Sequence, residues 1–447
     1  MKKIVSVLLI AMLAFTAIAG CSSGNQPVPE AKTPDNTGSD KQAKTEITIM
    51  VLGEWLKDLQ VLVGKFEEAN PDIKVSVVSL PFRQLFEGIE VQMNSKKPTF
   101  DLFTVDGPLV ANYTAKGFLE PLDSYITAEQ KGKLIDSSVQ LGTFNGKFMA
   151  SPLNTSSQLL YYNKDILTAK GVTPPSSDPK ERWTWEKLVE EGKKLTYDSN
   201  GDGQTDVFGF SFQQIGRPYQ VLPLAHSLGA KVISDNGIQA SGFTNSPEMV
   251  QASKFYFDLF NTWKISPKIS PDVSIDYFAT GKVAMFVGGT ALLKQLQDKG
   301  LSFGYAPIPY FDGQKPATPT GSWHLGISQF STKKEAAAKF IQYATVGEGS
   351  KVWFEQRNEI PANKELLDAI DKEAKFNEFP ASGLRLAAYE AKNTSVSRPS
   401  TPGYLEWESL LNKAYEDIKN GSEPKSALDN AADQIDRQLK KYETIAK

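Results

Sequence analysis

The sequence predicts an α/β fold built on a mostly parallel sheet flanked by helices, and three observations predict it. Short apolar segments typical of strands alternate with segments of helical periodicity. A chain of 447 residues is long enough for two or three domains. The composition, with 40% hydrophobic and 23% charged residues, is that of a folded protein.

The alternation is clearest at the start of the folded body. Apolar runs and helical spacing predict, in order, a strand at 47–53, a helix at 57–68, a strand at 73–80, a helix at 84–94 and a strand at 100–105. Later helices are expected at 184–195, with Thr184 as N-cap, and at 247–263, 333–346, 363–374, 405–419 and 425–442. No internal repeat is present.

Two of the predicted strands end in polar or aromatic residues beside a glycine. These ends are Gly53-Glu54-Trp55 and Val105-Asp106-Gly107. In open α/β sheets ligands bind outside the carboxyl ends of strands, so both tips are candidates for a binding cleft. Packing of Trp55 at a sheet edge is the alternative for that residue.

Charge and cysteine content exclude several functions. The net charge is −3, and no basic run is long enough to bind a phosphate backbone, so nucleic acid is not an expected partner. The only cysteine, Cys21, excludes a disulfide scaffold and a thiolate zinc site. The two histidines, His226 and His324, lie far apart in the sequence.

The N-terminus indicates export. Lys2 and Lys3 precede an apolar run that is too short for a membrane span and that ends at Ala19-Gly20-Cys21. This pattern resembles a bacterial lipobox, which implies that 1–20 are a lipoprotein signal peptide. It also implies that Cys21 carries acyl chains such as palmitate at the outer face of the cytoplasmic membrane. An ordinary signal peptide ending near a cysteine is the alternative. Residues 21–45 are polar and predict a flexible linker.

Seven segments together resemble one family. They are FEEANPDIKV (66–75), FDLFTVDGPLVANYTAKGFLEPLD (100–123), FNGKFMASPLNTSSQLLYYNKD (144–165), PPSSDPKERWTWEKL (174–188), LTYDSNGDGQTDVFGF (195–210), FATGKVAMFVGG (278–289) and FGYAPIPYFDGQ (303–314). Their order and content are similar to maltodextrin-type, oligosaccharide-binding extracellular solute-binding proteins of ABC importers. The similarity extends over essentially the whole mature body.

The resemblance implies a two-lobed, periplasmic-binding-protein-like fold (type II) with a ligand cleft between the lobes. Three chain crossings would join the lobes near residues 154–156, 307–309 and 360–361. The N-lobe would comprise 46–153 and 310–359, and the C-lobe 157–306 and 362–447. Ligand contacts to both lobes would favour the closed state. The expected role is capture of a sugar or oligosaccharide by a monomer and its delivery to ABC permease subunits, without catalysis and without a required cofactor.

A sugar site needs aromatic rings for the C–H faces and polar side chains for the hydroxyls. By position, the resemblance implies N-lobe contacts from Glu54, Trp55, Asp106 and Gly107, and contacts at the first crossing from Ser156 and Gln158. It implies contacts beyond the first crossing from Gln213, Gln214, Arg217, Tyr219, Gly289, Thr290, Trp323 and His324. Trp55 and Trp323 are the expected stacking residues, with Tyr219 behind them, whereas Trp185, Trp353 and Trp407 are expected in the core. Maltodextrin binders commonly have a carboxylate where this chain has Ser156, so maltose is not a specific expectation.

The loop at 198–206 has the spacing of a calcium loop. Oxygen-bearing side chains recur at alternate positions with glycine at the sixth, and the candidate ligands are Asp198, Asn200, Asp202, Gln204 and Asp206. The twelfth position is Gly209, so the loop is not a full EF-hand. A structural Ca²⁺ is expected, and a turn of Asn, Asp and Gly that needs no ion is the alternative.

Two rival functions remain open at this stage. An exported carbohydrate-cleaving enzyme would need paired carboxylates or an activated nucleophile, and none of the usual nucleophile, zinc or phosphate motifs occurs. A binder of another solute, such as a phosphate ester, would need clustered cations, for which Arg217 and Arg357 are candidates.

Overall fold

The computed structural model describes residues 44–213, 217–357 and 359–444. The predicted signal peptide, the predicted acylation site Cys21, the predicted linker up to residue 43 and the candidate contact Gln214 lie outside the described residues. Within the described part of the chain, no helix has both the length and the apolar character needed to span a membrane.

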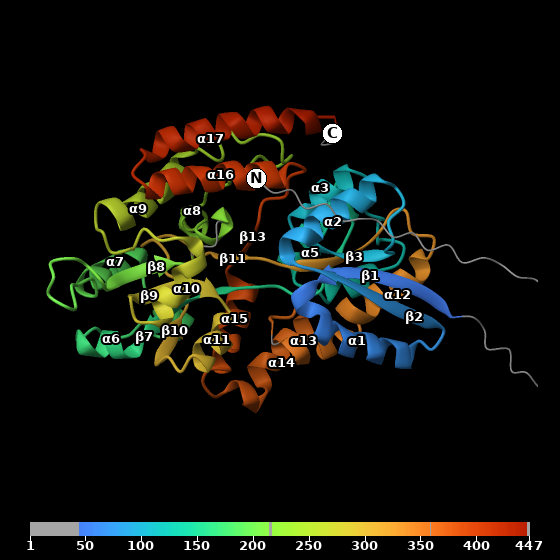
Figure 1. Cartoon of the computed structure of the whole chain (residues 1–447), viewed down its shortest axis with the longest axis horizontal. Coiled ribbons are helices and arrows are strands. Elements are labelled where there is room, and N and C mark those ends of the chain that lie inside the picture. Colours follow the sequence, from blue (N-terminus) through green and yellow to red (C-terminus); the bar gives the residue numbers. More distant parts are fainter. Residues whose placement is uncertain (1–43, 214–216, 358, 445–447) are drawn as a thin grey trace, which may run out of the picture. The chain divides into compact units, whose positions relative to one another are not determined.

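The first sheet is mixed and has five strands in the order β2-β1-β3-β12-β6. Three of them, β1, β2 and β3, are labelled in Figure 1. Its strands are β1 (Thr45–Leu52), β2 (Ile73–Leu80), β3 (Leu102–Asp106), β6 (Ser151–Pro152) and β12 (Trp323–Ile327). The strands β2, β1 and β3 are parallel, while β12 runs antiparallel to both β3 and β6. All five fall in the ranges predicted for the N-lobe, and we use that name for this sheet and its helices.

The second sheet has four strands in the order β10-β7-β9-β8. Its strands are β7 (Gln158–Asn163), β8 (Phe208–Phe212), β9 (Val283–Gly289) and β10 (Phe303–Ala306). Only β8 and β9 are parallel. The prediction of a mostly parallel sheet is therefore wrong, because strands that enter each sheet after a chain crossing run against their neighbours. We use the name C-lobe for this sheet and its helices; the exact lobe boundaries stay a prediction.

Helices surround both sheets. Those of the N-lobe are α1 (Leu56–Ala69), α2 (Phe82–Asn94), α3 (Leu109–Ala115), α4 (Ala128–Gly132), α5 (Asp136–Leu141), α12 (Lys334–Thr345) and α13 (Gly349–Arg357). Those that follow the C-lobe strands are α6 (Lys164–Ala169), α7 (Trp185–Lys194), α8 (Pro223–Ser227), α9 (Pro247–Asn261), α10 (Ser274–Ala279) and α11 (Leu292–Asp298). The C-terminal helices are α14 (Lys364–Lys372), α15 (Ser382–Asn393), α16 (Tyr404–Lys419) and α17 (Pro424–Leu439).

Short elements complete the fold. A hairpin joins β4 (Thr143–Phe144) to β5 (Lys147–Phe148), and β11 (Thr318–Thr320) pairs in parallel with β13 (Ser395–Ser397). The 3-10 helices are η1 (Gly53–Trp55), η2 (Pro179–Glu181), η3 (Pro218–Gln220), η4 (Pro271–Val273), η5 (Ala374–Phe376) and η6 (Lys440–Tyr442).

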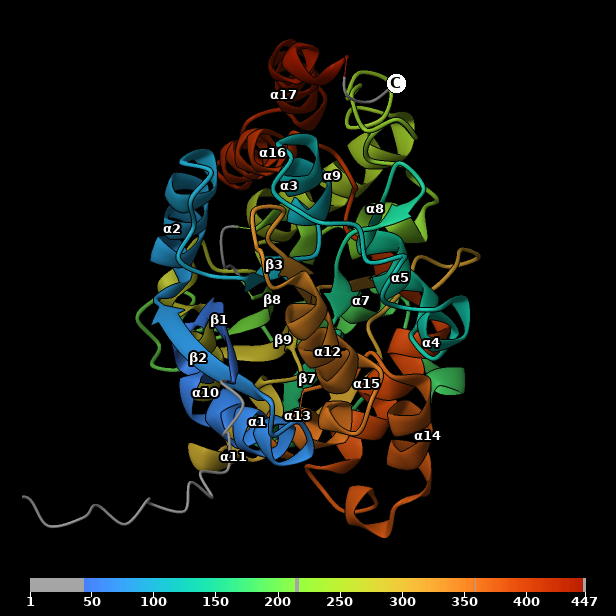
Figure 2. The ribbon, with the colours of Figure 1, turned by 90° about the vertical axis from the view of Figure 1, so that its right-hand side faces the viewer.

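The C-terminal helices α16 and α17 pack on the C-lobe helix α9, and α16 also contacts the N-lobe helix α3. Helices α3 and α16 lie next to each other in both ribbon views (Figures 1 and 2). The chain between α15 and α16 contains β13, which pairs with β11, the strand that follows the second crossing. The C-terminal region therefore contacts both lobes.

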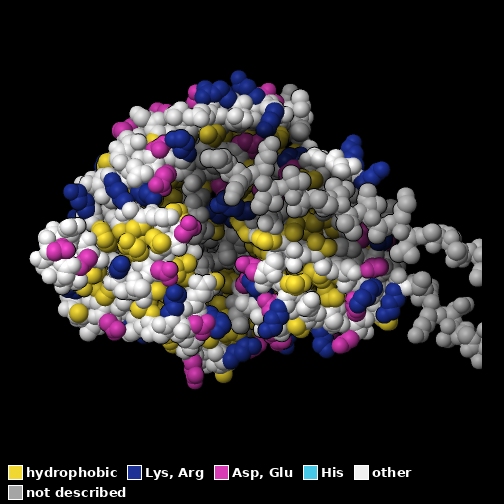
Figure 3. All heavy atoms as spheres, viewed as in Figure 1, with side chains coloured by type: hydrophobic (Ala, Val, Ile, Leu, Met, Phe, Trp, Pro, Cys, Tyr) yellow, Lys and Arg dark blue, Asp and Glu magenta, His cyan; other side chains and the backbone are white. Residues whose placement is uncertain are grey.

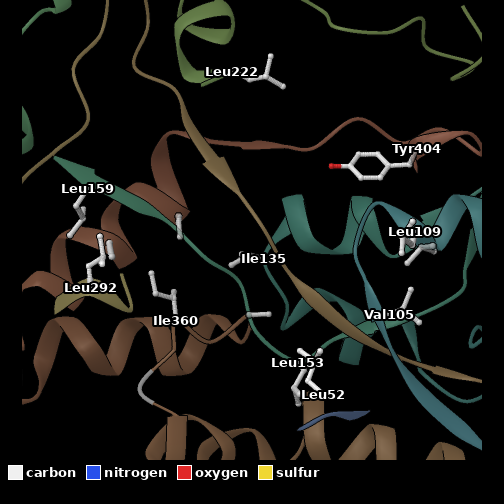
Figure 4. Close-up of a cluster of buried hydrophobic side chains, with 14 of the residues drawn as sticks. Leu52, Val105, Leu109, Ile135, Leu153, Leu159, Leu222, Leu292, Ile360 and Tyr404 are labelled. Carbon is white, nitrogen blue, oxygen red and sulfur yellow. The ribbon is translucent and has the colours of Figure 1, made fainter. Parts of the chain in front are cut away.

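The hydrophobic core extends through the crossings as well as the lobes. Leu153 on the first crossing and Ile360 on the third are 3% and 0% exposed, and both belong to the same buried cluster as Leu52 and Leu159 from the two sheets (Figure 4). Burial of apolar side chains contributes about 25 cal/mol per Å², so the crossings are anchored by the same effect that stabilises the lobes.

Candidate functional site

A cavity of about 840 Å³ lies between the two sheets, and its lining includes residues 154–158 at the first crossing, 321–323 after the second and Glu359 just before the third. The face in view in Figure 3 is hollowed between its two halves, and its acidic and basic side chains are interspersed. The polar and aromatic residues of the lining include Asp106, Asn154, Thr155, Ser156, Ser157, Gln158, Arg217, Tyr219, Gln220, Thr290, Trp323, Glu359 and Arg398. This volume falls in the range of small-molecule sites.

The first crossing, near residues 154–156, is hydrogen-bonded to the third crossing and to the chain that follows the second. The Thr155 N–H donates to the Ile360 carbonyl oxygen at 2.8 Å, which joins the first and third crossings. The Trp323 N–H donates to Asn154 Oδ1 at 2.9 Å, which joins the first crossing to the chain just after the second. These bonds hold the cavity floor in one arrangement.

Ser156 makes a similar link. Its Oγ accepts the Gly321 N–H at 2.7 Å. A Cβ at Gly321 would lie 3.0 Å from Ser156 Oγ and within 4 Å of Arg398 and Tyr219, so glycine permits this close approach. Ser156 therefore presents a hydroxyl that is already bonded to the backbone.

Asp106, at the tip of β3, is the centre of a buried ionic network. Both of its oxygens accept hydrogen bonds from Arg398, and Oδ2 also accepts one from Arg217 Nη2 at 2.8 Å. Arg217 in turn pairs with Glu408, whose Oε1 accepts a bond from the Tyr404 hydroxyl. Burial alone would raise the pKa of Asp106, but the two guanidinium groups lower it to about 2. With two positive and two negative side chains, the network has no net charge.

Trp323 is the half-buried aromatic residue of the N-lobe side of the cavity. Its ring lies 5.4 Å from that of Trp55 in an edge-on arrangement and 6.1 Å from the stacked ring of Phe86. Trp55 is 1% exposed, contacts Trp353 at 5.1 Å and does not line the cavity. Trp55 therefore supports Trp323 from behind and is not exposed to the cavity, while stacking of Trp323 on a ligand stays a prediction.

The ring of Tyr219 is engaged by two cations. The Arg398 guanidinium lies 4.8 Å and the Arg217 guanidinium 5.5 Å from its centroid. Cation–π contacts of this kind hold the charged planes in place. Two cations therefore already interact with the ring of Tyr219, which lines the cavity.

Of the thirteen predicted contacts within the described residues, eight line the cavity and five do not. Those at the cavity are Asp106, Ser156, Gln158, Arg217, Tyr219, Gly289, Thr290 and Trp323. Those away from it are Glu54, Trp55, Gly107, Gln213 and His324. Because these five residues lie outside the lining, a direct contact with the ligand is not assigned to them.

The five residues lie outside the cavity lining for different physical reasons. Glu54 points to solvent with 71% of its side chain exposed. Gln213 supports the site indirectly, because its Oε1 accepts the Gly289 N–H at 3.3 Å. His324 is 0% exposed, donates from Nε2 to the Ser138 carbonyl oxygen at 2.9 Å, and has its pKa lowered by burial to about 4. Gly107 packs against the backbone oxygen of Ser322.

Five buried polar atoms without a hydrogen-bond partner belong to residues of this lining. They are Thr155 Oγ1, Ser157 Oγ, Gln158 Oε1, Gln220 Oε1 and Arg398 Nε. A buried polar atom without a partner costs about 1–3 kcal/mol. A ligand rich in hydroxyl groups both donates and accepts, so it can satisfy such a mixed set.

Four of these residues were not singled out from the sequence. Thr155 and Ser157 flank the predicted Ser156, and Gln220 follows the predicted Tyr219, so extending the contacts by one residue would have found them. Arg398 had no signal, because SVSRPST (395–401) has neither periodicity nor a motif.

In the 198–206 loop the side-chain oxygens accept backbone N–H groups. Asp198 accepts from Asn200, Gly201 and Gly203, and the bonds from Gly203 and Gly201 lower the pKa of its carboxyl. Asp206 accepts from Ser199. Among the described residues, no group of three or more Asp, Glu, His or Cys side chains is arranged to hold a metal ion. Calcium binding by this loop stays a prediction.

The chain belongs to the family of bacterial extracellular solute-binding proteins, whose family model matches residues 53–349. The predicted two-lobed α/β fold of that class is confirmed. The interlobe cavity occupies the position where such a fold encloses its ligand.

Three relatives show how far the similarity extends. An ABC substrate-binding protein from Listeria monocytogenes, solved in complex with cycloalternan, is 27% identical with a TM-score of 0.75, covering 89% of this chain and 99% of that one. The galactooligosaccharide-binding protein of Bacillus subtilis is 24% identical over 98% of both chains. The sn-glycerol-3-phosphate-binding periplasmic protein of Salmonella typhimurium is 23% identical over 88% of this chain and 92% of its own.

Proposed function

We propose that the protein captures a neutral sugar or short oligosaccharide outside the cell by closing its lobes and delivers it to an ABC permease. The observation that carries the proposal is the cavity lining: buried polar atoms without partners beside a half-buried tryptophan. Hydroxyl groups match the polar atoms, and the C–H face of a sugar matches the indole ring. The relatives solved or named with oligosaccharides support the same solute class.

A phosphate ester, the second candidate, is favoured by the relative that binds sn-glycerol 3-phosphate. It would need a cation free to bind the phosphate. Each described cationic residue of the lining already lies within ion-pair distance of a carboxylate; these residues are Arg217, Lys294, Arg357, Lys375 and Arg398. This pairing favours a neutral ligand.

We further propose that binding is not followed by catalysis. A carbohydrate-cleaving site needs a carboxylic acid held neutral near pH 7. Asp106, the buried carboxylate of the lining, has its pKa lowered rather than raised, so it stays ionised and cannot donate a proton. Incubation with maltotriose and cycloalternan should leave both sugars intact by chromatography, and shortened products would refute this part of the proposal.

The ligand class is tested by thermal unfolding and calorimetry of the purified protein with maltotriose, cycloalternan, D-tagatose and sn-glycerol 3-phosphate. A ligand at 100 times its Kd adds about 2.7 kcal/mol to the free energy of unfolding. We expect at least one neutral sugar to stabilise the protein and the phosphate ester to have no effect. Stabilisation by the phosphate ester alone would refute the proposal.

We also propose where the protein acts, which is outside the cell at the membrane surface. The family is extracellular, and the lipobox-like residues before Cys21 support anchoring of the mature chain to the outer face of the cytoplasmic membrane through an acylated cysteine. The protein would act as a monomer that presents its closed lobes to the permease.

A further inference from the structure

We propose that Arg217 is a latch between the two lobes. It holds them together through Asp106 of the N-lobe and keeps Glu408 of the C-lobe side as its partner when the lobes separate. This inference rests on the proposed lobe closure. It gives Arg217, a predicted ligand contact, a role in setting the balance between the open and closed states of the protein itself.

The ion pair between Arg217 and Asp106 joins the lobes across the cavity. Asp106 ends β3 of the N-lobe sheet, whereas Arg217 lies between β8 of the C-lobe sheet and η3. Arg217 Nη2 donates to Asp106 Oδ2 at 2.8 Å, and the Asp106 side chain is 2% exposed. A hydrogen bond between two buried, charged groups is stronger than one between neutral groups. The pair therefore favours the state in which the lobes are together.

Arg217 has a second carboxylate on its own side of the cavity. Its Nε donates to Oε1 of Glu408, on α16, at 3.1 Å. Helix α16 packs on α9 and η3 of the C-lobe, and its Trp407 Nε1 donates to the Thr244 hydroxyl at 3.3 Å. Glu408 therefore stays beside Arg217 when the lobes move apart.

Asp106 likewise keeps a partner on the N-lobe. Both of its oxygens accept hydrogen bonds from Arg398. The residue before Arg398 is anchored to the N-lobe helix α5, because the Ser397 hydroxyl donates to the Ser137 carbonyl oxygen at 3.0 Å. Breaking a buried ion pair is strongly destabilising when it leaves a charge without a partner. Here separation of the lobes leaves both charges paired, so the latch opens at a low cost.

Aromatic rings repeat this arrangement around the Arg217 guanidinium. The centroid of Phe82, at the start of the N-lobe helix α2, lies 6.0 Å from it, and that of Tyr219 in η3 lies 5.5 Å from it. Both distances are within the range of a cation–π contact. Each lobe thus offers Arg217 one carboxylate and one ring, and only the N-lobe set is lost on opening.

Two substitutions should act in opposite directions. Arg217→Met removes the latch, so we expect it to favour the open state. Glu408→Gln removes the carboxylate that compensates Arg217 in the open state, leaves the bond to Asp106, and keeps an oxygen for the Tyr404 hydroxyl. We expect E408Q to favour the closed state. The apparent affinity for a ligand rises with the fraction of protein in the binding-competent state, so the two variants should also differ in Kd.

Calorimetry with maltotriose and cycloalternan measures this difference. For the sugar that the wild type binds, R217M should raise Kd about tenfold, and E408Q should leave it unchanged or lower it by up to about tenfold. Small-angle X-ray scattering of the ligand-free proteins should give a larger radius of gyration for R217M than for E408Q. Because no sugar is present in that measurement, it separates a latch from a lost ligand contact.

The matched control is Arg182→Met. Arg182 forms a buried ion pair with Glu390 at 2.6 Å and does not line the cavity. R182M should lower the melting temperature, since it leaves a buried carboxylate without its cation, while Kd stays within about twofold of the wild type and the radius of gyration is unchanged.

Equal radii of gyration for R217M and E408Q, or a rise in Kd of similar size in both, would overturn the latch and leave the proposed sugar ligand intact. A wild type that binds neither sugar would refute the proposed ligand, and the scattering comparison would still decide on the latch. If R217M does not fold, Arg217→Gln replaces it with the same expected shifts, because it also removes the charge.

Discussion

Replacing Trp55 and Trp323 by alanine, one at a time, distinguishes a supporting ring from a ligand-binding ring. The two rings contact each other at 5.4 Å, yet Trp55 is 1% exposed and Trp323 is half-buried at the cavity. We therefore expect Trp55→Ala to reduce mainly the stability of the ligand-free protein. We expect Trp323→Ala to reduce mainly sugar affinity.

The magnitudes follow from the burial of each ring. Removing a fully buried tryptophan costs about 3–5 kcal/mol of unfolding free energy, so Trp55→Ala should lose that much. Trp323 gives up part of its contact with Trp55, Phe82 and Phe86, and we expect a loss of about 1–2 kcal/mol without ligand. The lost stacking on the sugar is worth about 1.5–3 kcal/mol, which weakens binding about 10- to 100-fold.

Urea unfolding of the ligand-free variants measures the free energy of unfolding, and calorimetry with maltotriose and cycloalternan measures the sugar affinity. Trp353→Ala is the control, because Trp353 packs on the far side of Trp55 and is 2% exposed. It should resemble Trp55→Ala in both assays. A Trp55→Ala protein with wild-type stability and no sugar binding would refute the assignment of Trp55 to the core.

Three further predictions concern acid stability, calcium and anchoring. Burial lowers the pKa of His324 to about 4 in the folded state against about 6.5 when unfolded, so the unfolded chain takes up the proton first. The free energy of unfolding should fall by about 3 kcal/mol between pH 6.5 and pH 4, and His324→Gln should lack this part of the slope in a pH series of urea titrations. Adding Ca²⁺ to EDTA-treated protein should raise its melting temperature, and Asp198→Ala should remove the increase; identical melting curves with Ca²⁺ and with EDTA would contradict calcium at 198–206. Cys21→Ser should move the protein from the membrane fraction to the medium, and unchanged membrane association on immunoblots would argue against acylation.

Local patterns predicted the elements whose stabilising interactions are close in the sequence. The alternating run at 73–80 has the same bounds as β2, and the predicted helix start at Thr184 is confirmed by its hydroxyl, which accepts the Lys187 N–H. Strand β12 was not predicted, because its partners in β3 are more than 200 residues away. Its direction within the sheet depends on that long-range pairing, which periodicity does not record.

Long-range contacts that sequence patterns do not reveal also determine the candidate site. Asp106 was predicted correctly as a polar strand tip that lines a cavity, but its role could not be read from its neighbours in the sequence. Its charge is compensated by Arg398, 292 residues further along the chain. The exposure of Trp55 could not be predicted either, because Trp353 and Trp323, which cover it, come from distant segments. Residue type indicated the chemistry of the site, whereas tertiary packing decided which side chains are available for it.

The crossings connect ligand contact to lobe position. Thr155, Ser156 and Ser157 line the cavity and lie at the first crossing, which is hydrogen-bonded to Gly321 after the second crossing and to Ile360 on the third. A ligand that bonds to Thr155 or Ser157 therefore acts on the segment about which the lobes move, and contacts from Trp323 on the N-lobe side and Gln158 on the C-lobe side form only when the lobes are close. A ligand shifts the lobes only by its difference in affinity between the two states, so contacts confined to one lobe would bind sugar without closing the cleft. Selection of the solute and closure of the lobes consequently depend on the same hydrogen bonds.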